Sequence, residues 1–413
     1  MTNDQIVIIG GGAAGFFAAI AAAENSQMQV TLLEASRQPL AKVRISGGGR
    51  CNVTHACFEP TALVQHYPRG GKALLGAFTR FQPRDTIGWF ANRGVPLKIE
   101  ADGRMFPITD DSQTIVNCLM RSAQACDVNI ATGSIVKSVK LLNKKFEIGL
   151  KSGEEFVCDR LVLATGSNPL GYKIAQELGH SILPPVPSLF TFNIPDPKLR
   201  QLAGVSVNPV RLRLSIPGEK TLEQMGALLI THWGVSGPAV LKLSAWGARM
   251  LQGSKYQGKL QINWLPQMTV EEVKQKLLLV KQEWGKRTVG LHRGVDLPHR
   301  LWQYMIDRAG ITRDIRWADV PNKSLNLLLQ ELTQGQYLVS GKGVFKEEFV
   351  TCGGVNLKEV NFKTMESKLV PGLYFAGEIL DIDGVTGGFN FQSAWTTGYL
   401  AGAGVQGEKG EKH

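Results

Sequence analysis

The sequence lacks the features of a membrane, secreted or metal-binding protein. Its 413 residues contain no uninterrupted apolar run near the ~18 residues of a membrane-spanning helix, and the first residues, MTNDQ, lack the basic stretch of a secretory signal. The cysteines at positions 51, 57, 118, 126, 158 and 352 form no CxxC pair and no metal-type spacing, which predicts reduced thiols and no metal site. We therefore expect a cytoplasmic protein without membrane association, whose redox chemistry, if any, uses a cofactor.

Acidic residues are scarce in one part of the chain. Residues 189–345 contain 21 Lys and Arg against 11 Asp and Glu, a net charge of +10, whereas the remainder has 25 against 24. Such a surplus suits an anionic partner, with nucleic acid first among them, and it also occurs on the surfaces of enzymes that bind none. Both interpretations stay open from charge alone.

The first 34 residues have the pattern of a dinucleotide-binding unit. An apolar run at 6–9 predicts a buried strand and leads into Gly10-x-Gly12-x-x-Gly15, an alanine-rich helix and a second apolar run that ends at Glu34. Gly10 would permit the tight turn, Gly12 the approach of a pyrophosphate, and Gly15 close packing of helix on strand, while Glu34 would accept from ribose hydroxyls. The complete order disfavours the alternative, a glycine-rich turn in a nucleotide-free α/β protein.

Later segments favour FAD over NAD as the dinucleotide. Residues 128–167 read as successive strands ending in ATG, and residues 372–404 read as a strand, a glycine-rich loop and a helix. These features resemble the flavoproteins with two dinucleotide-binding domains. That resemblance implies that backbone near Val136 meets the adenine, that Glu378 contacts the ribityl chain, and that a helix starting near Asn390 faces the flavin, where its amino terminus would stabilise negative charge.

The stretch SGGGR at 46–50 predicts a backbone cradle for this cofactor. Three glycines let the chain approach a pyrophosphate or a flavin ring closely. Lys42, Arg44 and Arg50 suit phosphate or flavin oxygens, with a solvated surface position as the alternative for Lys42.

Cys51 follows this cradle directly. Cys51 and Cys57 have five residues between them, not the C-x4-C of a disulfide reductase, so that activity is disfavoured. The thiol of Cys51 is either a proton donor beside the flavin or, as we expect, a buried structural group.

The motifs SGGGRCN, TCGGV from Thr351, THWGVSGPAVLKLSAW and GLYFAGEILDIDGVTGGFNFQSAW together resemble the BaiN/RdsA-type family of FAD-dependent oxidoreductases over nearly the whole chain. The resemblance implies a Rossmann-like α/β FAD-binding domain, 1–188 and 346–413, with an inserted β-barrel and helical substrate domain, 189–345. It implies reduction of an activated C=C bond in an enone or a uracil-type ring. It places FAD contacts on Gly10, Gly12, Ala13, Ala14, Glu34, Arg44, Gly49, Arg50, Val136, Gly166, Glu378, Gly388, Asn390 and Gln392.

The basic insert also contains most of the tryptophans. Basic residues interleaved with aromatic rings suit RNA, although tryptophan at helical spacing is more often core. In WGVSGPA, Pro238 stands where a nucleophile elbow needs glycine, so Ser236 is predicted to cap the following helix. His232 could line a substrate site or be structural. The six insert tryptophans are at 233, 246, 264, 284, 302 and 317.

The electron donor and the catalytic acid are less defined by the sequence. No second GxGxxG follows Gly166, which predicts one dinucleotide fold and transient binding of NAD(P)H. Cys51, Thr351 and His232 are the candidate catalytic residues. Two alternatives to a C=C reductase remain: a flavin oxidase acting on a small amine or alcohol, and an RNA-binding flavoprotein whose flavin is structural or senses redox state.

Overall fold

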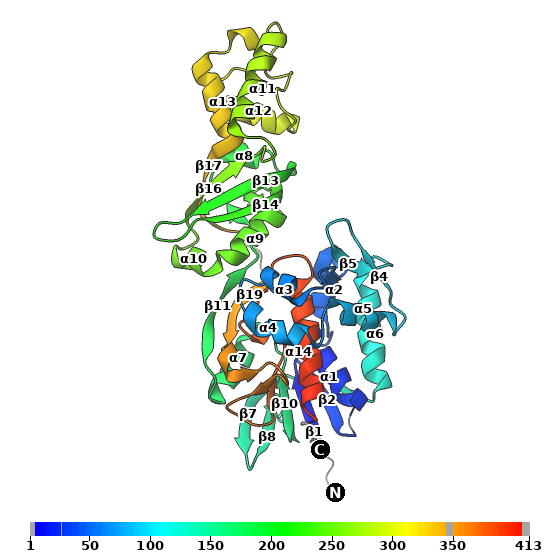
Figure 1. Ribbon diagram of the computed structural model, residues 1–413. Coiled ribbons are helices and arrows are strands. Elements are labelled where there is room, and N and C mark those ends of the chain that lie inside the picture. The colour runs from blue at the N-terminus through cyan, green and yellow to red at the C-terminus, as the bar shows by residue number, and fades with distance from the viewer. Residues whose placement is uncertain (1–4, 26, 344–349, 407–413) are drawn as a thin grey trace. The chain divides into compact units, whose positions relative to one another are not determined.

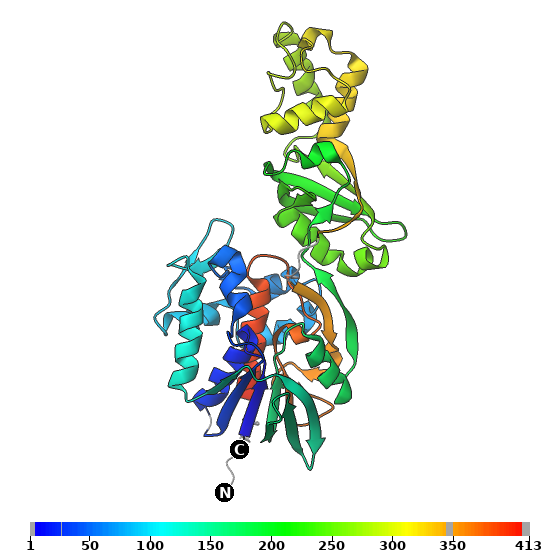
Figure 2. The same cartoon turned by 180° about the vertical axis from the view of Figure 1, so that it is seen from behind.

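The computed structural model describes residues 5–25, 27–343 and 350–406. The chain divides into two compact units, one of residues 1–185 and 350–413 and the other of residues 186–349. Among the described residues, no helix combines the length and the apolarity needed to cross a membrane. Figures 1 and 2 show the elements of each unit from opposite sides.

The first unit is built on a seven-stranded sheet in the order β20-β21-β22-β10-β1-β2-β6. The five strands from β22 to β6 are parallel, and Ile9 at the end of β1 pairs with Leu163 of β10. Residues 6–9 are almost fully buried, as the predicted apolar strand requires. The strands are β1 (Gln5–Ile9), β2 (Gln29–Glu34), β6 (Asn129–Thr132), β10 (Arg160–Leu163), β20 (Val360–Asn361), β21 (Glu366–Ser367) and β22 (Leu373–Phe375).

Two helices from opposite ends of the chain lie side by side in this unit (Figure 1). They are α1 (Ala13–Asn25) and α14 (Phe389–Gly404). A Cβ placed on Gly398 would lie 2.5 Å from the backbone oxygen of Ala14, and one on Gly402 would lie 2.3 Å from that of Ala18. Glycine at these positions therefore permits the close packing that joins the two ends of the chain into one domain.

The meander predicted after residue 128 is present as a three-stranded antiparallel sheet of β7 (Val136–Leu142), β8 (Lys145–Leu150) and β9 (Glu155–Cys158). The further elements of this unit come before β7 or after β9 in the chain. They are α2 (Ala41–Gly49), β3 (Thr54–His55), α3 (Pro60–Leu63), η1 (Val64–His66), α4 (Gly71–Phe78), α5 (Pro83–Ala91), β4 (Leu97–Ile99), β5 (Arg104–Pro107), α6 (Ser112–Ala125), α7 (Pro169–Glu177), β19 (Val350–Val355), η3 (Leu357–Glu359) and η4 (Gly377–Ile379). The strand β11 (Ile182–Ser188) leads from this unit into the insert.

The insert contains a second sheet, in the order β17-β16-β13-β14-β15-β12-β18. All its neighbouring strands are antiparallel. The strands at the two ends of this order, β17 and β18, are separated in the chain only by Ser340, whose N–H donates to the oxygen of Asn193 in β12. The strands are β12 (Phe192–Asn193), β13 (Ser206–Ser215), β14 (Leu222–Ile230), β15 (Gly234–Ser236), β16 (Gly258–Asn263), β17 (Gly335–Val339) and β18 (Gly341–Lys342).

The helices of the insert share one core with its sheet. Trp264, Trp302 and Trp317 are almost completely buried in that core, so the core interpretation is correct for these three tryptophans. The prediction for Ser236 is wrong, because it ends β15 and the cap position of α9 is Gly237, which has no side chain to accept from the helix. The helices are α8 (Pro197–Arg200), α9 (Pro238–Trp246), α10 (Ala248–Gly253), α11 (Val270–Glu283), α12 (His299–Arg308), η2 (Trp317–Asp319) and α13 (Asn322–Gln334).

Candidate cofactor and active site

The glycine turn between β1 and α1 has the geometry of a phosphate-binding loop. Gly10 has a φ of +114°, and a Cβ there would lie 2.3 Å from the backbone oxygen of Ala164. A Cβ on Gly15 would lie 1.9 Å from the oxygen of Gly10. A Cβ on Gly12, by contrast, would meet no atom within 4 Å. Two glycines are thus required by the fold, while Gly12 faces open space where a ligand can approach the backbone.

The amino terminus of α1 follows this turn. The helix begins at Ala13, and its first N–H groups have no acceptor within the helix, which makes this end favourable for a phosphate. Ala14 is buried, and a Cβ on Gly377 would lie 2.7 Å from the Ala14 Cβ. The start of α1 therefore packs against the strand-to-loop junction near Glu378.

Glu34 lies at the end of β2, beside the glycine turn. Its Oε2 accepts from the Gly11 N–H at 2.6 Å, and its Oε1 accepts from the Ser36 N–H at 2.7 Å. These two bonds hold the carboxylate in one orientation and leave lone pairs on both oxygens. The carboxylate is therefore suited to accept from a ribose diol, as the sequence predicts.

The glycine stretch after Lys42 forms a left-handed bend inside α2. Gly47, Gly48 and Gly49 have φ values of +58°, +70° and +85°. A Cβ on Gly48 or Gly49 would meet no atom within 4 Å, whereas one on Gly47 would come within 3.0 Å of the Phe106 ring. The bend presents bare backbone to open space, as a backbone cradle for a ligand would require.

Glu378 connects this region to the carboxyl-terminal segment. Its Oε2 forms an ion pair with Lys42 Nζ at 2.6 Å, and its Oε1 accepts from the backbone N–H of Thr351 at 2.9 Å. A Cβ on Gly166 would lie 3.6 Å from the same carboxylate. Four residues predicted separately, from four distant parts of the sequence, thus meet at one point.

The two arginines of the cradle have different surroundings. Arg44 donates to Gln113 Oε1, and its Nε is buried without a hydrogen-bond partner. Arg50 forms an ion pair with Glu100 at 2.6 Å and lies 4.0 Å from the centroid of the Phe106 ring. The Nε of Arg44 is therefore enclosed by protein, whereas the guanidinium of Arg50 already pairs with a carboxylate of the protein.

Cys51 is a fully buried thiol. Its side chain is 0% exposed, and burial raises the pKa of the thiol to about 12. A thiol with this pKa stays protonated and unreactive near neutral pH. These observations favour the structural interpretation of Cys51 over that of a proton donor.

The loop before α14 is held by side chains of the helix. Asn390 Oδ1 accepts from the Gly384 N–H at 2.8 Å, and Asn390 Nδ2 donates to the Gly384 oxygen at 2.9 Å. Gly388, at the helix cap, has a φ of +95°, and a Cβ there would lie 2.5 Å from the oxygen of Thr54. Asn390 and Gly388 therefore shape the loop that precedes the helix amino terminus.

The side chain of Gln392 does not match its predicted role. It is 0% exposed, its Oε1 accepts from the hydroxyls of Thr54 and Thr86, and its Nε2 donates to Thr396. These bonds use the amide inside the core of the unit. Any contact of Gln392 with a cofactor would have to come from its backbone.

Val136 and His232 are the remaining predicted site residues. Val136 begins β7, where it pairs with Leu150 and is buried. His232 belongs to the insert, where its side chain is exposed between β14 and β15.

Two buried groups that the sequence did not single out also lie near these residues. The hydroxyls of Thr165 and Tyr172, which follow the strand β10, are buried and have no hydrogen-bond partner in the described parts of the chain. Burial raises the pKa of Tyr172, and the negative charges of Glu378 and Asp381 raise it further. The segment ATGSNPLGYK contains both residues, but nothing in its pattern distinguishes them from ordinary core residues.

A second unexpected group surrounds the loop before α14. The Phe389 ring is stacked against His66, with a centroid distance of 4.2 Å, and against His55, with a centroid distance of 4.6 Å. Arg69 forms an ion pair with Asp383, whose side chain is fully buried. These contacts hold the loop in place, and their partners are too distant in the sequence to be found from it.

The described residues contain no group of His, Cys, Asp and Glu that could hold a metal ion. The residues described above suit FAD instead. Open backbone at Gly12, Gly48 and Gly49 and the oriented Glu34 carboxylate match a dinucleotide with a pyrophosphate and a ribose. The fold and this site define a Rossmann-type flavoprotein.

Comparisons with known proteins identify the family. The family model described as "HI0933-like protein Rossmann domain" matches residues 4–404. The ribosomal RNA dihydrouridine synthase of Escherichia coli K12 is 32% identical over 92% of each chain. The 3-dehydro-bile acid delta(4,6)-reductase of Clostridium scindens is 29% identical over 97% of this chain and 98% of its own. The chain belongs to the HI0933-like family and is an FAD-dependent oxidoreductase, which confirms the resemblance drawn from the sequence.

A solved structure supports the fold alone. The 3-ketosteroid-delta4-(5alpha)-dehydrogenase of Rhodococcus jostii RHA1 is 15% identical, with a TM-score of 0.51. The match covers 98% of this chain and 96% of that protein. At this identity the match shows a similar fold and carries no statement about cofactor or activity.

Proposed function

We propose that this enzyme reduces a carbon–carbon double bond conjugated to a carbonyl group. The observation that carries the proposal is the similarity to two relatives whose activities, formation of dihydrouridine and reduction of a steroid dienone, share this chemistry. Bound FAD supplies the hydride in such a reduction. One carbon of the double bond receives the hydride and its neighbour receives a proton, so the substrate gains two electrons and two hydrogens.

The cofactor is held, in this proposal, by backbone of the glycine turn and of the bend in α2. Glu34 accepts from the adenosine ribose, and the amino terminus of α1 and the positive charge of Arg44 stabilise the pyrophosphate. Glu378 accepts from the ribityl chain, and its ion pair with Lys42 is weakened when it does so. The further proposed contacts are Ala13, Ala14, Gly15, Gly49, Arg50, Val136, Gly166, Gly388, Asn390 and the backbone of Gln392. We do not assign to Cys51, Thr351 or His232 the role of donating the proton to the substrate.

We propose that residues 1–188 and 346–413 are the FAD-binding domain and that residues 189–345 are the substrate domain. The insert would then be a small barrel with a helical part. The barrel is supported by the pairing of β17 with β16 and of β18 with β12, because these two short strands are separated only by Ser340.

We propose a uracil-type base in RNA as the substrate class, with a small enone as the other candidate. The net charge of +10 over residues 189–345 favours the polyanion. NAD(P)H is the proposed electron donor, bound transiently because the chain has one GxGxxG unit between strand and helix and that unit holds FAD.

Stopped-flow spectroscopy tests this function on the purified yellow protein. The flavin is reduced under anaerobic conditions with NADH or NADPH, and its reoxidation is followed after mixing with ribosomal RNA or with a small enone. We expect reoxidation that is faster with one of these substrates than with buffer, and loss of dihydrouridine in RNA from a deletion strain. Reoxidation by air alone at a catalytic rate, with no response to either substrate, would identify an oxidase.

A further inference from the structure

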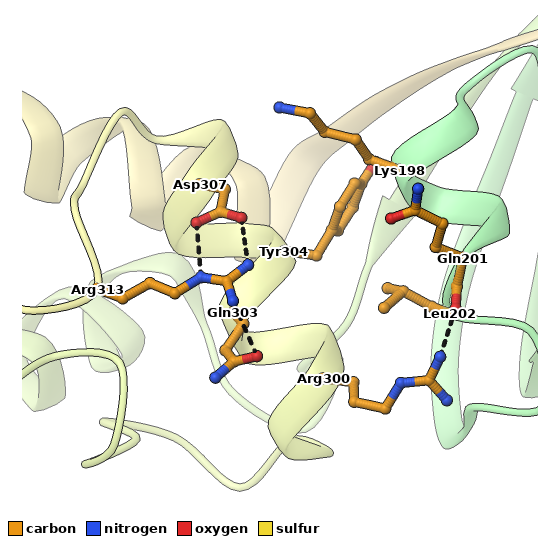
Figure 3. Close-up of a pocket in the computed structure, with 8 residues that line it drawn as sticks. All are labelled: Lys198, Gln201, Leu202, Arg300, Gln303, Tyr304, Asp307 and Arg313. Atoms are coloured by element: carbon orange, nitrogen blue, oxygen red, sulfur yellow. Dashed lines mark hydrogen bonds and ion pairs between the residues drawn. The ribbon is translucent and has the colours of Figure 1, made fainter.

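The insert contains a solvent-open depression of about 500 Å³ between α8 and one face of α12 (Figure 3). The residues that α12 contributes are Arg300, Gln303, Tyr304 and Asp307, whose spacing of three and four places them on one side of the helix. Lys198 of α8 and Arg313, beyond the end of α12, line the remainder. Three cations and one carboxylate therefore surround a volume within the usual range of ligand sites.

Two of the cations, Arg300 and Lys198, are not neutralised by a carboxylate of the described chain. Arg300 Nη2 donates to the backbone oxygen of Gln201, a bond that orients the guanidinium but adds no negative charge (Figure 3). Within the parts of the chain that the structure describes, neither Arg300 nor Lys198 forms an ion pair with a carboxylate. Both side chains are exposed. Their charges are therefore available to an anion that enters the depression.

The third cation is oriented by its neighbours. Arg313 donates to the two carboxylate oxygens of Asp307 at 2.7 and 3.2 Å, and its Nη1 lies 3.4 Å from Gln303 Oε1 (Figure 3). The Asp307 carboxylate accepts from two of the five N–H donors of Arg313. These bonds fix the orientation of the guanidinium and leave further N–H groups free. Because Asp307 offsets its charge, Arg313 contributes oriented N–H donors to the depression and little net charge.

Arg308, on the same helix, makes the contrast clear. It is paired with Glu331 at 2.7 Å and with Asp196 at 3.5 Å, and it lies against the Tyr337 ring. Its charge stabilises the insert and is not available to a ligand. The depression is therefore defined by a subset of the basic residues, which the charge count of the sequence does not distinguish.

We propose that this depression is a phosphate-binding site that takes one backbone phosphodiester of an RNA substrate. An oriented arginine fork and a mobile lysine are the groups that bind phosphate oxygens most effectively. The proposal rests on the RNA substrate proposed above and assigns to Lys198, Arg300 and Arg313 the task of anchoring the strand. The depression is open to solvent, so an RNA strand can extend from the bound phosphodiester in both directions.

The test compares two double variants of the full-length, FAD-loaded protein. The site variant is Lys198→Gln with Arg300→Gln. The control variant, Lys220→Gln with Lys276→Gln, removes the same charge from exposed lysines of the insert that do not line the depression. Binding of a fluorescein-labelled single-stranded oligouridine is measured by anisotropy between about 50 and 200 mM salt. The flavin spectrum and the unfolding midpoint show that each variant is folded.

We expect the site variant to bind roughly tenfold or more weakly at low salt, and its plot of log K against log salt to be shallower by about 0.7, the change for one lost phosphate contact on a single strand. The control variant should keep the slope of the parent. Equal losses in both variants, or equal slopes in the parent and the site variant, would overturn the site. Competition by ADP at the same affinity as the oligouridine would overturn RNA as the ligand in favour of a small phosphate compound.

The binding measurement is independent of turnover, so it separates this proposal from the proposed function. Oligouridine binding that is lost in the site variant supports the site even if no C=C reduction is found. Reduction of a small enone by a parent protein that does not bind oligouridine supports the reductase and overturns the site.

Discussion

The two units of this protein use their conspicuous residues differently. In the FAD-binding unit, glycines and charged residues from distant parts of the sequence meet around open backbone, as at Gly12 and Glu378. In the insert, Trp302 is buried in the core and Arg308 is paired with Glu331. A motif that restricts the backbone has one structural solution and so predicts a site. A composition bias does not, because each basic or aromatic side chain can instead serve packing or an internal ion pair.

The largest expected effect tests the insert side of this comparison. Trp302 is 0% exposed and Trp233 is 60% exposed. Trp302→Ala should lower the free energy of unfolding of the insert by about 3 to 5 kcal/mol because it leaves a large cavity, whereas Trp233→Ala should change it by less than ~0.5 kcal/mol. Denaturation followed by circular dichroism measures both. Equal effects of the two substitutions would contradict the assignment of Trp302 to the core.

The glycine turn offers the corresponding test in the FAD-binding unit. Gly15→Ala places a Cβ 1.9 Å from the oxygen of Gly10 and should cost about 2 kcal/mol or more of stability. Gly12→Ala meets no protein atom and should leave stability within ~0.5 kcal/mol, yet lower FAD affinity at least about tenfold, since the methyl group enters the space of the pyrophosphate. Thermal unfolding and FAD titration separate the two effects. A Gly12→Ala protein that retains FAD like the parent would remove this turn from the cofactor site.

Glu34→Ala should loosen FAD without unfolding the protein. Loss of charge-assisted hydrogen bonds to the ribose costs ~1.5 to 3 kcal/mol, or roughly ten- to a hundredfold in affinity. Release of FAD is followed by its fluorescence. Glu147→Ala, which removes an exposed carboxylate from β8, is the matched control. Similar FAD affinity in both variants would show that Glu34 does not bind the ribose.

The burial of Cys51 predicts how stability and thiol alkylation depend on pH. Its thiol has a pKa of about 12 in the folded protein, raised by burial from an ordinary value of 9.0, so the folded state holds the proton more tightly. The resulting stability is complete below about pH 9 and is lost as the pH rises toward 12. Alkylation near about pH 8 should therefore modify the partly exposed Cys57 before Cys51, as peptide mass spectrometry can show. Rapid labelling of Cys51 in the folded protein would revive it as a reactive thiol.

The smallest expected effect concerns Lys42. Its side chain is 57% exposed, so the ion pair with Glu378 should contribute only about 0.2 to 1 kcal/mol to stability. Lys42→Ala should leave the unfolding midpoint nearly unchanged. A similarly small change in FAD affinity would support the surface interpretation of Lys42, whereas a loss of tenfold or more would show that it contacts the cofactor.

The sequence by itself determined the family, the cofactor and the elements around the glycine turn. The order of apolar strand, glycine turn, helix and terminal acid predicted β1, α1, β2 and Glu34, because each step has a strict backbone requirement that few other arrangements satisfy. The segments around Gly47 and Glu378 were likewise predicted from local patterns. Those patterns work because close approach of backbone to a ligand needs glycine.

Only the tertiary structure decided which side chains remain available for chemistry. The core bonds of Gln392, the burial of Cys51 and the ion pair of Arg50 depend on partners tens to hundreds of residues away. The same holds for Lys198 and Arg300, whose charges stay uncompensated while that of Arg308 does not. Burial and charge pairing arise from contacts between distant segments, so the local sequence of a residue cannot state whether its functional group is free.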